Sequence, residues 1–575
     1  MSVTLSSTLI APEAAGLLAS VDGFHRRSPT RLLKSEYRRL LRRPIRSVAE
    51  LESFIRDYES LREGLDAKTA RLYALKDAHV DNEAIQRRFK RFSEQVLPDF
   101  LTLQAAIEQK YRDCPFRERL PQDRYALYDR KMVSSARITT PRSGEFVCEE
   151  QRLLDEYASL MSSLTIRFHG RVWSYSDFKK AFLNASRAYR KEAWEARGVA
   201  FAEVEPRLSE IFDELVAMRQ AQARDVGFRN YINYFNCYRQ RYDFTPFDCK
   251  TLQNRVEKYI VPLASAIWER KCRLFDLDSI RPWDLSVYAR RQQITPPHRS
   301  PKQLLDQTEG IFQKIHPQFG DDFRQMRDMK EFDIRRRPGK ADVNECFDFP
   351  DTRRPFILTN PPGRYDDIIW LVHESGHGLN IIAARDEELY SYRQVPALFA
   401  EVPSTAMEMI ALDHAGSLFS SRDYRKVRRL YFQRLVLDIP DFALADAWQH
   451  WVYANPGAGI ERRNEKFCEL DARFNPGINW DGVEEFRHGA ALRDDHNFSM
   501  PLYDIEYIVA ALAALQILQN YRENPVAAIR MLRKAMSLGG SVSPRQLFRE
   551  AGIALSFSDR TFGRATEFLA RELDL

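Results

Sequence analysis

The chain has 575 residues, of which 44% are hydrophobic and 29% are charged, and its formal net charge at pH 7 is +6. This composition is ordinary for a globular protein, and so small a charge on so long a chain does not by itself indicate nucleic-acid binding. No apolar run reaches the ~20 residues that a membrane-spanning helix needs, and the N-terminal stretch lacks the basic start of a secretory signal, so we expect neither.

The first predicted elements are helices. Residues 26–46 are strongly basic, which is typical either of a solvated helix face or of a surface for an anionic membrane or polynucleotide; we favour the solvated face. The next segment, 47–61, starts with a possible capping box at Ser47 and Glu50 and carries an apolar stripe at three- and four-residue steps. Similar patterns over 67–112 and 150–164 predict further helices.

Strand patterns are sparse. Residues 164–178 predict a hairpin that turns at Gly170, and residues 344–364 predict two short strands followed by a loop. The chain is also longer than the about 250–300 residues at which single hydrophobic cores stop growing. The sequence therefore predicts a mostly helical protein of two or more lobes with a small β element.

The loop leads into a predicted helix over 366–384 that contains "HESGH". Apolar residues surround this helix on nearly all sides, which is typical of a buried helix. His373 and His377 are four residues apart and so share one helix face, with Glu374 directly after the first. This H-E-x-x-H arrangement predicts two zinc ligands and a general base.

A catalytic zinc ion needs a third protein ligand. A third histidine six residues after His377 is absent, and Glu387 and Glu388 belong to a predicted exposed loop. A second apolar helix, predicted over 397–413, carries Glu401 and Glu408, two helical turns apart on one face. The pattern predicts that one of these is the ligand and that the other holds a ligating histidine, but it leaves the order open.

The strings "HESGH" and "FAEVPSTAMEM" together resemble the thimet oligopeptidase and oligoendopeptidase F family of zinc metallopeptidases, and the oligoendopeptidase F branch in particular. The blocks "IPDFALADAWQHWVYANP" and "HNFSMPLYDIEYIVAALAALQI" extend the resemblance, as does "RPWDL". The resemblance covers residues from about 165 onwards. We therefore divide the chain into an N-terminal helical region, 1–165, and a catalytic zinc peptidase region, 166–575.

The resemblance implies one Zn²⁺ per chain, held by His373, His377 and Glu401, with Glu374 as general base and Glu408 behind the ligands. It also implies a helical two-lobed shell around a deep central channel, with a small antiparallel β element beside the zinc site. In this picture an extended peptide substrate pairs with the sheet edge near 355–360.

The resemblance to the family also includes the block at 496–507. In the family, residues of this block bind the substrate and stabilise the oxyanion, which makes His496, Tyr503 and Tyr507 candidate catalytic residues, with Tyr507 preferred. One departure from the family pattern is Asn380, where many relatives have histidine or glutamine. Asn380 is not needed as a ligand, and we expect it to alter only the surroundings of the ligands.

The function that the resemblance implies is zinc-dependent endopeptidase activity on short oligopeptides. The alternatives are a zinc carboxypeptidase or dipeptidyl carboxypeptidase, a non-catalytic peptide-binding protein, and a surface-associated protein that uses the basic segment. Seven scattered cysteines with no Cys-x-x-Cys pair predict a reducing compartment, and hence a cytoplasmic protein. The sequence does not indicate an oligomeric state.

Overall fold

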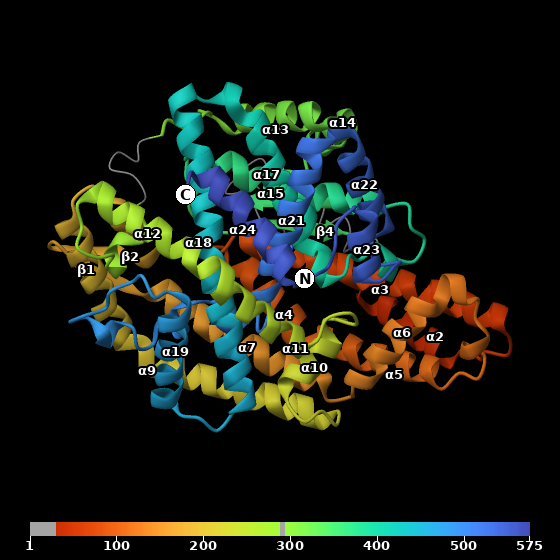
Figure 1. The fold of residues 1–575 in the computed structure, drawn as a ribbon. Helices are drawn as coiled ribbons and strands as arrows, with labels where there is room; N and C mark the ends of the chain where they lie inside the picture. The colour runs from red at the N-terminus through yellow and green to blue at the C-terminus, as the bar shows by residue number, and fades with distance from the viewer. Residues whose placement is uncertain (1–29, 288–293) are drawn as a thin grey trace.

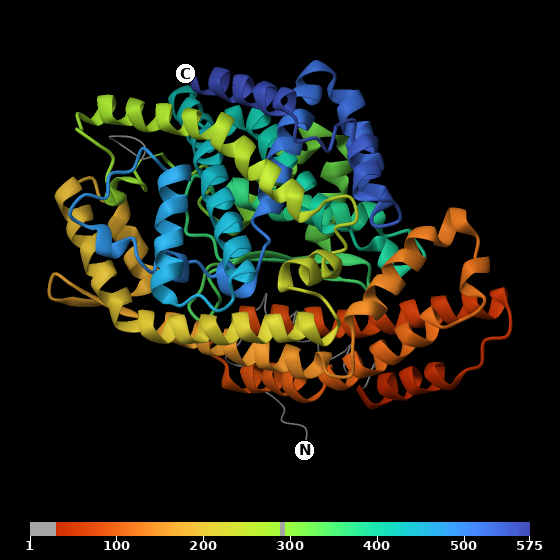
Figure 2. The same ribbon diagram turned by 60° about the horizontal axis from the view of Figure 1, so that its bottom comes forward.

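A computed structural model describes residues 30–287 and 294–575 and shows a mostly helical protein (Figure 1). Figure 2 shows the N-terminal helices, in red and orange, as a layer along the bottom of the molecule, with the cyan and blue helices of the C-terminal half above it. The first four residues of the basic segment, 26–29, lie outside the described residues. Within the described stretches, no helix combines the length and the apolar character needed to cross a membrane.

The N-terminal helices include the predicted helical segments 47–61, 67–112 and 150–164 almost entirely, whereas the helix over 122–138 was not predicted. They are α2 (Thr30–Arg42), α3 (Val48–Ala78), α4 (Glu83–Gln95), α5 (Leu97–Arg112), α6 (Gln122–Ile138) and α7 (Ser143–Ser163). Ser47 caps α3 by accepting the backbone N–H of Glu50, whereas the Glu50 carboxylate accepts the N–H of Arg46, so the box is shifted by one residue. Helix α2 buries Leu33, Tyr37 and Leu40 and turns most of its arginines to solvent.

The rest of the chain alternates short strands with long helices. The middle part contains β1 (Thr165–Phe168), β2 (Arg171–Ser174), α8 (Tyr175–Phe178), α9 (Arg187–Asp225), α10 (Tyr231–Tyr238), α11 (Pro246–Arg255), α12 (Val261–Phe275), α13 (Pro301–Ile315) and α14 (Pro317–Asp328). The last part contains β3 (Phe332–Asp333), β4 (Asn344–Phe349), β5 (Arg354–Thr359), α15 (Asp367–Ala384), α16 (Tyr390–Arg393), α17 (Ala397–His414), α18 (Ser421–Ala454), α19 (Ile460–Phe474), α20 (His496–Ser499), α21 (Ile505–Glu523), α22 (Pro525–Leu538), α23 (Pro544–Glu550) and α24 (Asp559–Leu573).

Both predicted strand pairs form. β1 and β2 make the hairpin around Gly170, and β4 pairs antiparallel with β5. The two-residue strand β3, which the sequence did not predict, adds parallel to the other side of β5. The strand order is therefore β3-β5-β4, and residues 355–360 belong to the central strand and its end. Our expectation that this segment offers a free edge is wrong; the edge strands are β3 and β4.

The three-stranded sheet lies between two hydrophobic cores. Alternate side chains of a strand point to opposite faces. Phe356 and Leu358 of β5 join the core of the N-terminal helices, whereas Ile357 joins the larger core that α15 shares with the C-terminal helices. On that side α17 packs against both α15 and α21 in the centre of the molecule (Figure 1). The predicted fold class is confirmed; the boundary at residue 165 stays a prediction.

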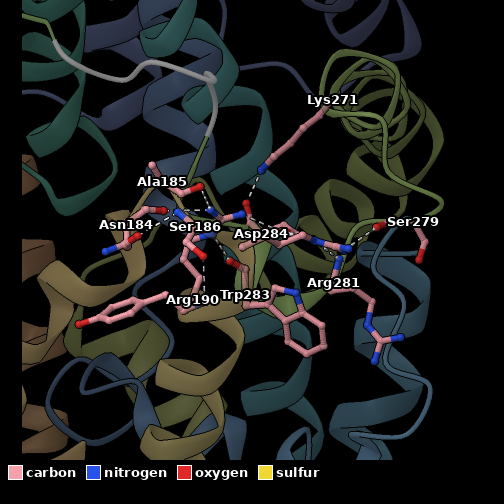
Figure 3. Close-up of polar contacts among 11 residues, drawn as sticks. Asn184, Ala185, Ser186, Arg190, Lys271, Ser279, Arg281, Trp283 and Asp284 are labelled. Atoms are coloured by element: carbon pink, nitrogen blue, oxygen red, sulfur yellow. Dashed lines mark hydrogen bonds and ion pairs between the residues drawn. The ribbon is translucent and has the colours of Figure 1, made fainter. Parts of the chain in front are cut away.

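The "RPWDL" segment fixes the start of α9 (Figure 3). The Asp284 carboxylate is fully buried and accepts hydrogen bonds from Arg187, at 2.8 Å, and Arg190, at 3.0 Å. Lys271 of α12 donates to the backbone carbonyl of the same residue. A buried carboxylate needs such charged partners to offset its desolvation. The cluster therefore joins α9 and α12 through one short segment.

Candidate active site

The N-terminus of α15 is held by one buried carboxylate. Oδ2 of Asp367 accepts the backbone N–H groups of Gly363 and Arg364, both at 2.9 Å, and lies 3.1 Å from Nε2 of His298. An acid in this position also suits the positive end of the helix dipole. These bonds fix the loop after β5 to the helix that carries the H-E-x-x-H residues.

The structure brings the three predicted metal ligands together. Nε2 of His373 and Nε2 of His377 are 3.2 Å apart, and Oε2 of Glu401 lies 3.4 Å from the first and 3.3 Å from the second. A tetrahedral zinc ion with bonds of about 2.0–2.1 Å requires donor atoms about 3.3 Å apart. The three side chains therefore fit a zinc ion, and they leave a fourth position open.

Partners behind the ligands fix their orientation. Nδ1 of His373 lies 2.5 Å from Oε1 of Glu408, and Oε1 of Glu401 accepts the hydroxyl of Tyr503 at 2.7 Å. Burial opposes the ionisation of Glu401, but the charge of His377 and the bonds from both imidazoles outweigh it and hold the pKa well below its usual range. His373 and Glu401 thus each present one atom inwards while their other polar atom is engaged.

Gly376 explains how Glu401, 28 residues after His373 in the chain, reaches the site. A Cβ on Gly376 would lie 2.6 Å from Cα of Ser404, so α15 and α17 cross there in backbone contact. A Cβ on Gly378 would instead meet the mobile end of Met326 at 2.9 Å and Pro355 at 3.3 Å. Only Gly376 is required by the close approach of another backbone.

We expect Gly376→Ala to lower the free energy of unfolding by about 1–3 kcal/mol, because the new methyl group forces the two helices apart. The matched control is Gly378→Ala, where Met326 can move aside and alanine gains up to ~1 kcal/mol of helix propensity. Urea unfolding of both variants measures the difference. Equal stabilities would contradict the backbone contact.

Glu374 faces a cavity of about 510 Å³. Lining residues come from several helices and include Trp370, His373, Glu374, Phe442, His496 and Tyr507. Burial raises the pKa of Glu374 above its usual range, with the two imidazoles opposing the shift. A carboxylate with a raised pKa is a better proton acceptor at neutral pH than an ordinary one.

His496 and Tyr507 form a pair of hydrogen-bond donors in the cavity wall. The His496 ring stacks on Tyr507, with centroids 6.0 Å apart, and its Nδ1 lies 3.0 Å from Oδ1 of Asp504. That hydrogen bond raises the pKa of His496 to about 9 against the opposing effect of burial. Burial also raises the pKa of Tyr507, so its hydroxyl keeps its proton.

The remaining predicted residues differ in their distance from this centre. The Tyr503 hydroxyl donates to the Glu401 carboxylate, and its role in catalysis stays a prediction. Glu387 and Glu388 lie in the loop after α15, as predicted, and Glu388 pairs with Arg124. Asn380 is buried and lies outside the group of three ligand atoms.

The sequence analysis missed the contribution of α18 to the cavity. Arg434 and Asp438 of this helix line it, together with Phe442, and the first two form an ion pair at 3.2 Å. Asp504, which sets the pKa of His496, was also missed. The only sequence signal for α18 was its place in the resembling block 439–456, which does not say which face points inwards.

Comparison with known proteins gives one family match and several relatives. The profile described as Peptidase family M3 matches residues 182–564. The chromosomal oligoendopeptidase F of Lactococcus lactis subsp. cremoris is 24% identical over 44% of this chain and 43% of its own length. Group B oligopeptidase PepB of Streptococcus agalactiae is 19% identical over 67% of this chain and 63% of its own length. Both alignments thus span less than two thirds of the curated relative.

Among solved structures, PZ peptidase A with inhibitor 2 superposes with a TM-score of 0.87 at 24% sequence identity. The superposition covers 94% of this chain and 97% of that chain. The structure of oligoendopeptidase-F from Enterococcus faecium gives a TM-score of 0.63 at 13% identity and covers 98% and 97% of the two chains. These likenesses show that the fold is shared along nearly the whole length.

Proposed function

The chain belongs to peptidase family M3, and on this premise we propose that it is a zinc-dependent endopeptidase that hydrolyses internal bonds of short oligopeptides. The observation that carries the proposal is the triangle of His373, His377 and Glu401 donor atoms, 3.2–3.4 Å on each side, beside Glu374 in the cavity wall. A zinc ion held there would supply Lewis acidity to polarise the scissile carbonyl.

The chain's own residues would perform the proton transfers. Glu374 would accept the proton of the attacking water and deliver it to the leaving amine. Protonated His496 and the Tyr507 hydroxyl would donate to the oxygen on which negative charge develops. An extended peptide would add to the outer edge of β4, where Asn344 lines the cavity. The seven free cysteines support a reducing, cytoplasmic location.

The test is hydrolysis of an internally quenched peptide of roughly ten residues, blocked at both ends, with products identified by mass spectrometry. We expect internal cleavage that a chelator abolishes and zinc restores, while a folded protein substrate stays intact. Release of C-terminal residues only, and only from unblocked peptides, would favour the carboxypeptidase alternative. Binding without cleavage would favour a peptide-binding protein.

The two tyrosines are expected to respond differently to loss of the hydroxyl. Tyr507→Phe should lower kcat by about 10²–10³-fold with little change in KM, because its bond forms in the transition state. Tyr503→Phe should instead weaken metal binding about 10–100-fold, because Glu401 loses its partner. Steady-state kinetics with metal titration measures both. Near-parental kcat in Tyr507→Phe would make this residue structural.

The pH profile should reveal the protonated state of His496. Its pKa is raised to about 9, so the imidazolium is present at neutral pH and is lost as the pH rises through about 9, which predicts a falling alkaline limb of kcat/KM. Asp504→Asn removes the negative charge that favours the imidazolium and should move this limb to lower pH. An alkaline limb that stays in place in this variant would exclude His496 as its origin.

A further inference from the structure

A second cluster of metal-ligand side chains lies between α11 and α18. Cys249 and Gln253 are four residues apart on α11, and Asp446 and His450 are four apart on α18, so each pair shares a helix face. The ligand atoms of Cys249, Asp446 and His450 all lie within 4.8 Å of one another. Among the described residues, this is one of two such groups, and the other is the candidate active site.

Two polar atoms in this cluster are buried without a hydrogen-bond partner. Asp446 is fully buried, and its Oδ1 accepts no hydrogen bond; Nε2 of His450 is likewise unpartnered. The two atoms face each other at 3.6 Å, which is too long for a hydrogen bond. Buried polar groups are normally satisfied, and an ion bound between them is one recognised reason for an exception.

The remaining contacts orient the carboxylate. Nε2 of Gln253 donates to Oδ2 of Asp446 at 2.6 Å, which leaves Oδ1 pointing at His450. The nearby cation Arg241 is bonded to the buried Glu506 at 2.8 Å, so its charge is already balanced. Cys249 is buried beside Asp446 and His450, and its thiol would lose its proton on binding a divalent cation.

We propose that Cys249, Asp446 and His450 form a second zinc-type site, separate from the H-E-x-x-H centre. A thiolate, a carboxylate and a neutral imidazole are ligands that zinc accepts, and the two negative charges balance the ion. Tetrahedral bonds of about 2.0–2.1 Å require O and N donor atoms about 3.3 Å apart, and Oδ1 of Asp446 and Nε2 of His450, at 3.6 Å, are close to that separation. The three donors leave the fourth tetrahedral position for a further ligand.

The site has a structural consequence for the active-site cavity. Helix α18 lines the cavity with residues 427–442 and carries Asp446 and His450 in its next turns. An ion shared with Cys249 would join α18 to α11. Just before α11 in the chain, Arg241 is bonded to Glu506 of α21, which connects this region to a third helix. The ion would thus hold one wall of the cavity in place without touching substrate.

Cobalt substitution tests the proposal. Cobalt bound to a thiolate absorbs strongly in the near ultraviolet, whereas the H-E-x-x-H centre contains no sulfur. After chelation and reconstitution with Co²⁺, we expect two ions per chain and this absorption in the parent protein. Cys249→Ser should retain one ion and lose the absorption, whereas Glu401→Ala should retain one ion and keep it.

The matched control is Cys114→Ser, which changes a buried cysteine of the N-terminal core and should keep both ions and the absorption. If Cys249→Ser does not fold, the partly exposed His450→Asn serves instead and should shift or abolish the band. The proposal is overturned if saturated parent protein shows no sulfur absorption, or if the band survives in Cys249→Ser. In that case His450 and Asp446 form an ion pair only.

Thermal unfolding gives an independent readout. An ion that binds the native state alone stabilises it by mass action. In the Glu401→Ala background, adding a chelator should lower Tm, and it should have no effect once Cys249→Ser is added. An equal effect of the chelator in both proteins would contradict a site at Cys249.

Discussion

Glu374→Gln is expected to lower the turnover number by about 10²–10⁴-fold while the metal content stays unchanged. The amide keeps the shape of the side chain but cannot accept the proton of the attacking water, and it cannot return that proton to the leaving amine. Glu374 is outside the triangle of candidate ligand atoms, so we expect zinc binding not to depend on it. Steady-state kinetics on one quenched peptide, with elemental analysis of the same sample, measures both quantities.

Glu345→Gln is the control for charge. Glu345 of β4 has a pKa raised to about 7, mainly by desolvation and further by the charges of Asp77 and Glu374, so the variant removes a neighbouring titratable carboxyl and leaves the base in place. We expect a far smaller loss of turnover than in Glu374→Gln. Loss of zinc in Glu374→Gln would instead show that this carboxylate is a ligand.

Glu401→Ala is expected to abolish zinc binding at the H-E-x-x-H centre, and activity with it. The change removes one of three protein ligands and leaves the hydroxyl of Tyr503 and both imidazoles without their shared partner. Catalytic zinc sites hold their ion with three protein ligands, so two histidines alone should bind it far more weakly. Equilibrium dialysis against zinc measures the loss.

Glu387→Ala is the matched control, because it removes an acid from the loop that follows the same helix and touches none of the ligands. Its zinc content and activity should equal those of the parent. Glu408→Gln should fall between the two, since it weakens the support of His373 but leaves all three ligands. If Glu401→Ala still bound zinc fully, Glu401 would not be the third ligand.

The local part of the site was predictable because it depends on helix geometry alone. His373 and His377 share a face of any helix that contains them, and the apolar flanks of 366–384 predicted both the helix and its burial. The position of Glu401 beside the two histidines was not predictable in this way. It depends on the crossing at Gly376, which spacing does not reveal, and only the resemblance chose between Glu401 and Glu408.

In the three-stranded sheet, the sequence pattern was interpreted wrongly at one point, the position of β5. The strands were predicted from their β-forming residues, but the order of the strands was not. The continuous apolar run "PFIL" in β5 is typical of a strand that is buried on both faces, which indicates a central position. Strand β3 has two residues and no pattern of its own, so nothing in the sequence predicted that it would cover the second side of β5.

The placement of the sheet between two cores also constrains the order in which the chain can fold during synthesis. The N-terminal helices bury their aromatic residues against Phe347 and Phe349 of β4 and Tyr392 of α16, which leave the ribosome long after Met132. Until then the nascent N-terminal layer presents an apolar face with no native cover. Such exposed surface promotes aggregation and attracts chaperones. We therefore expect chains truncated before β4 to be captured by chaperones, and chains extended through α16 to escape them.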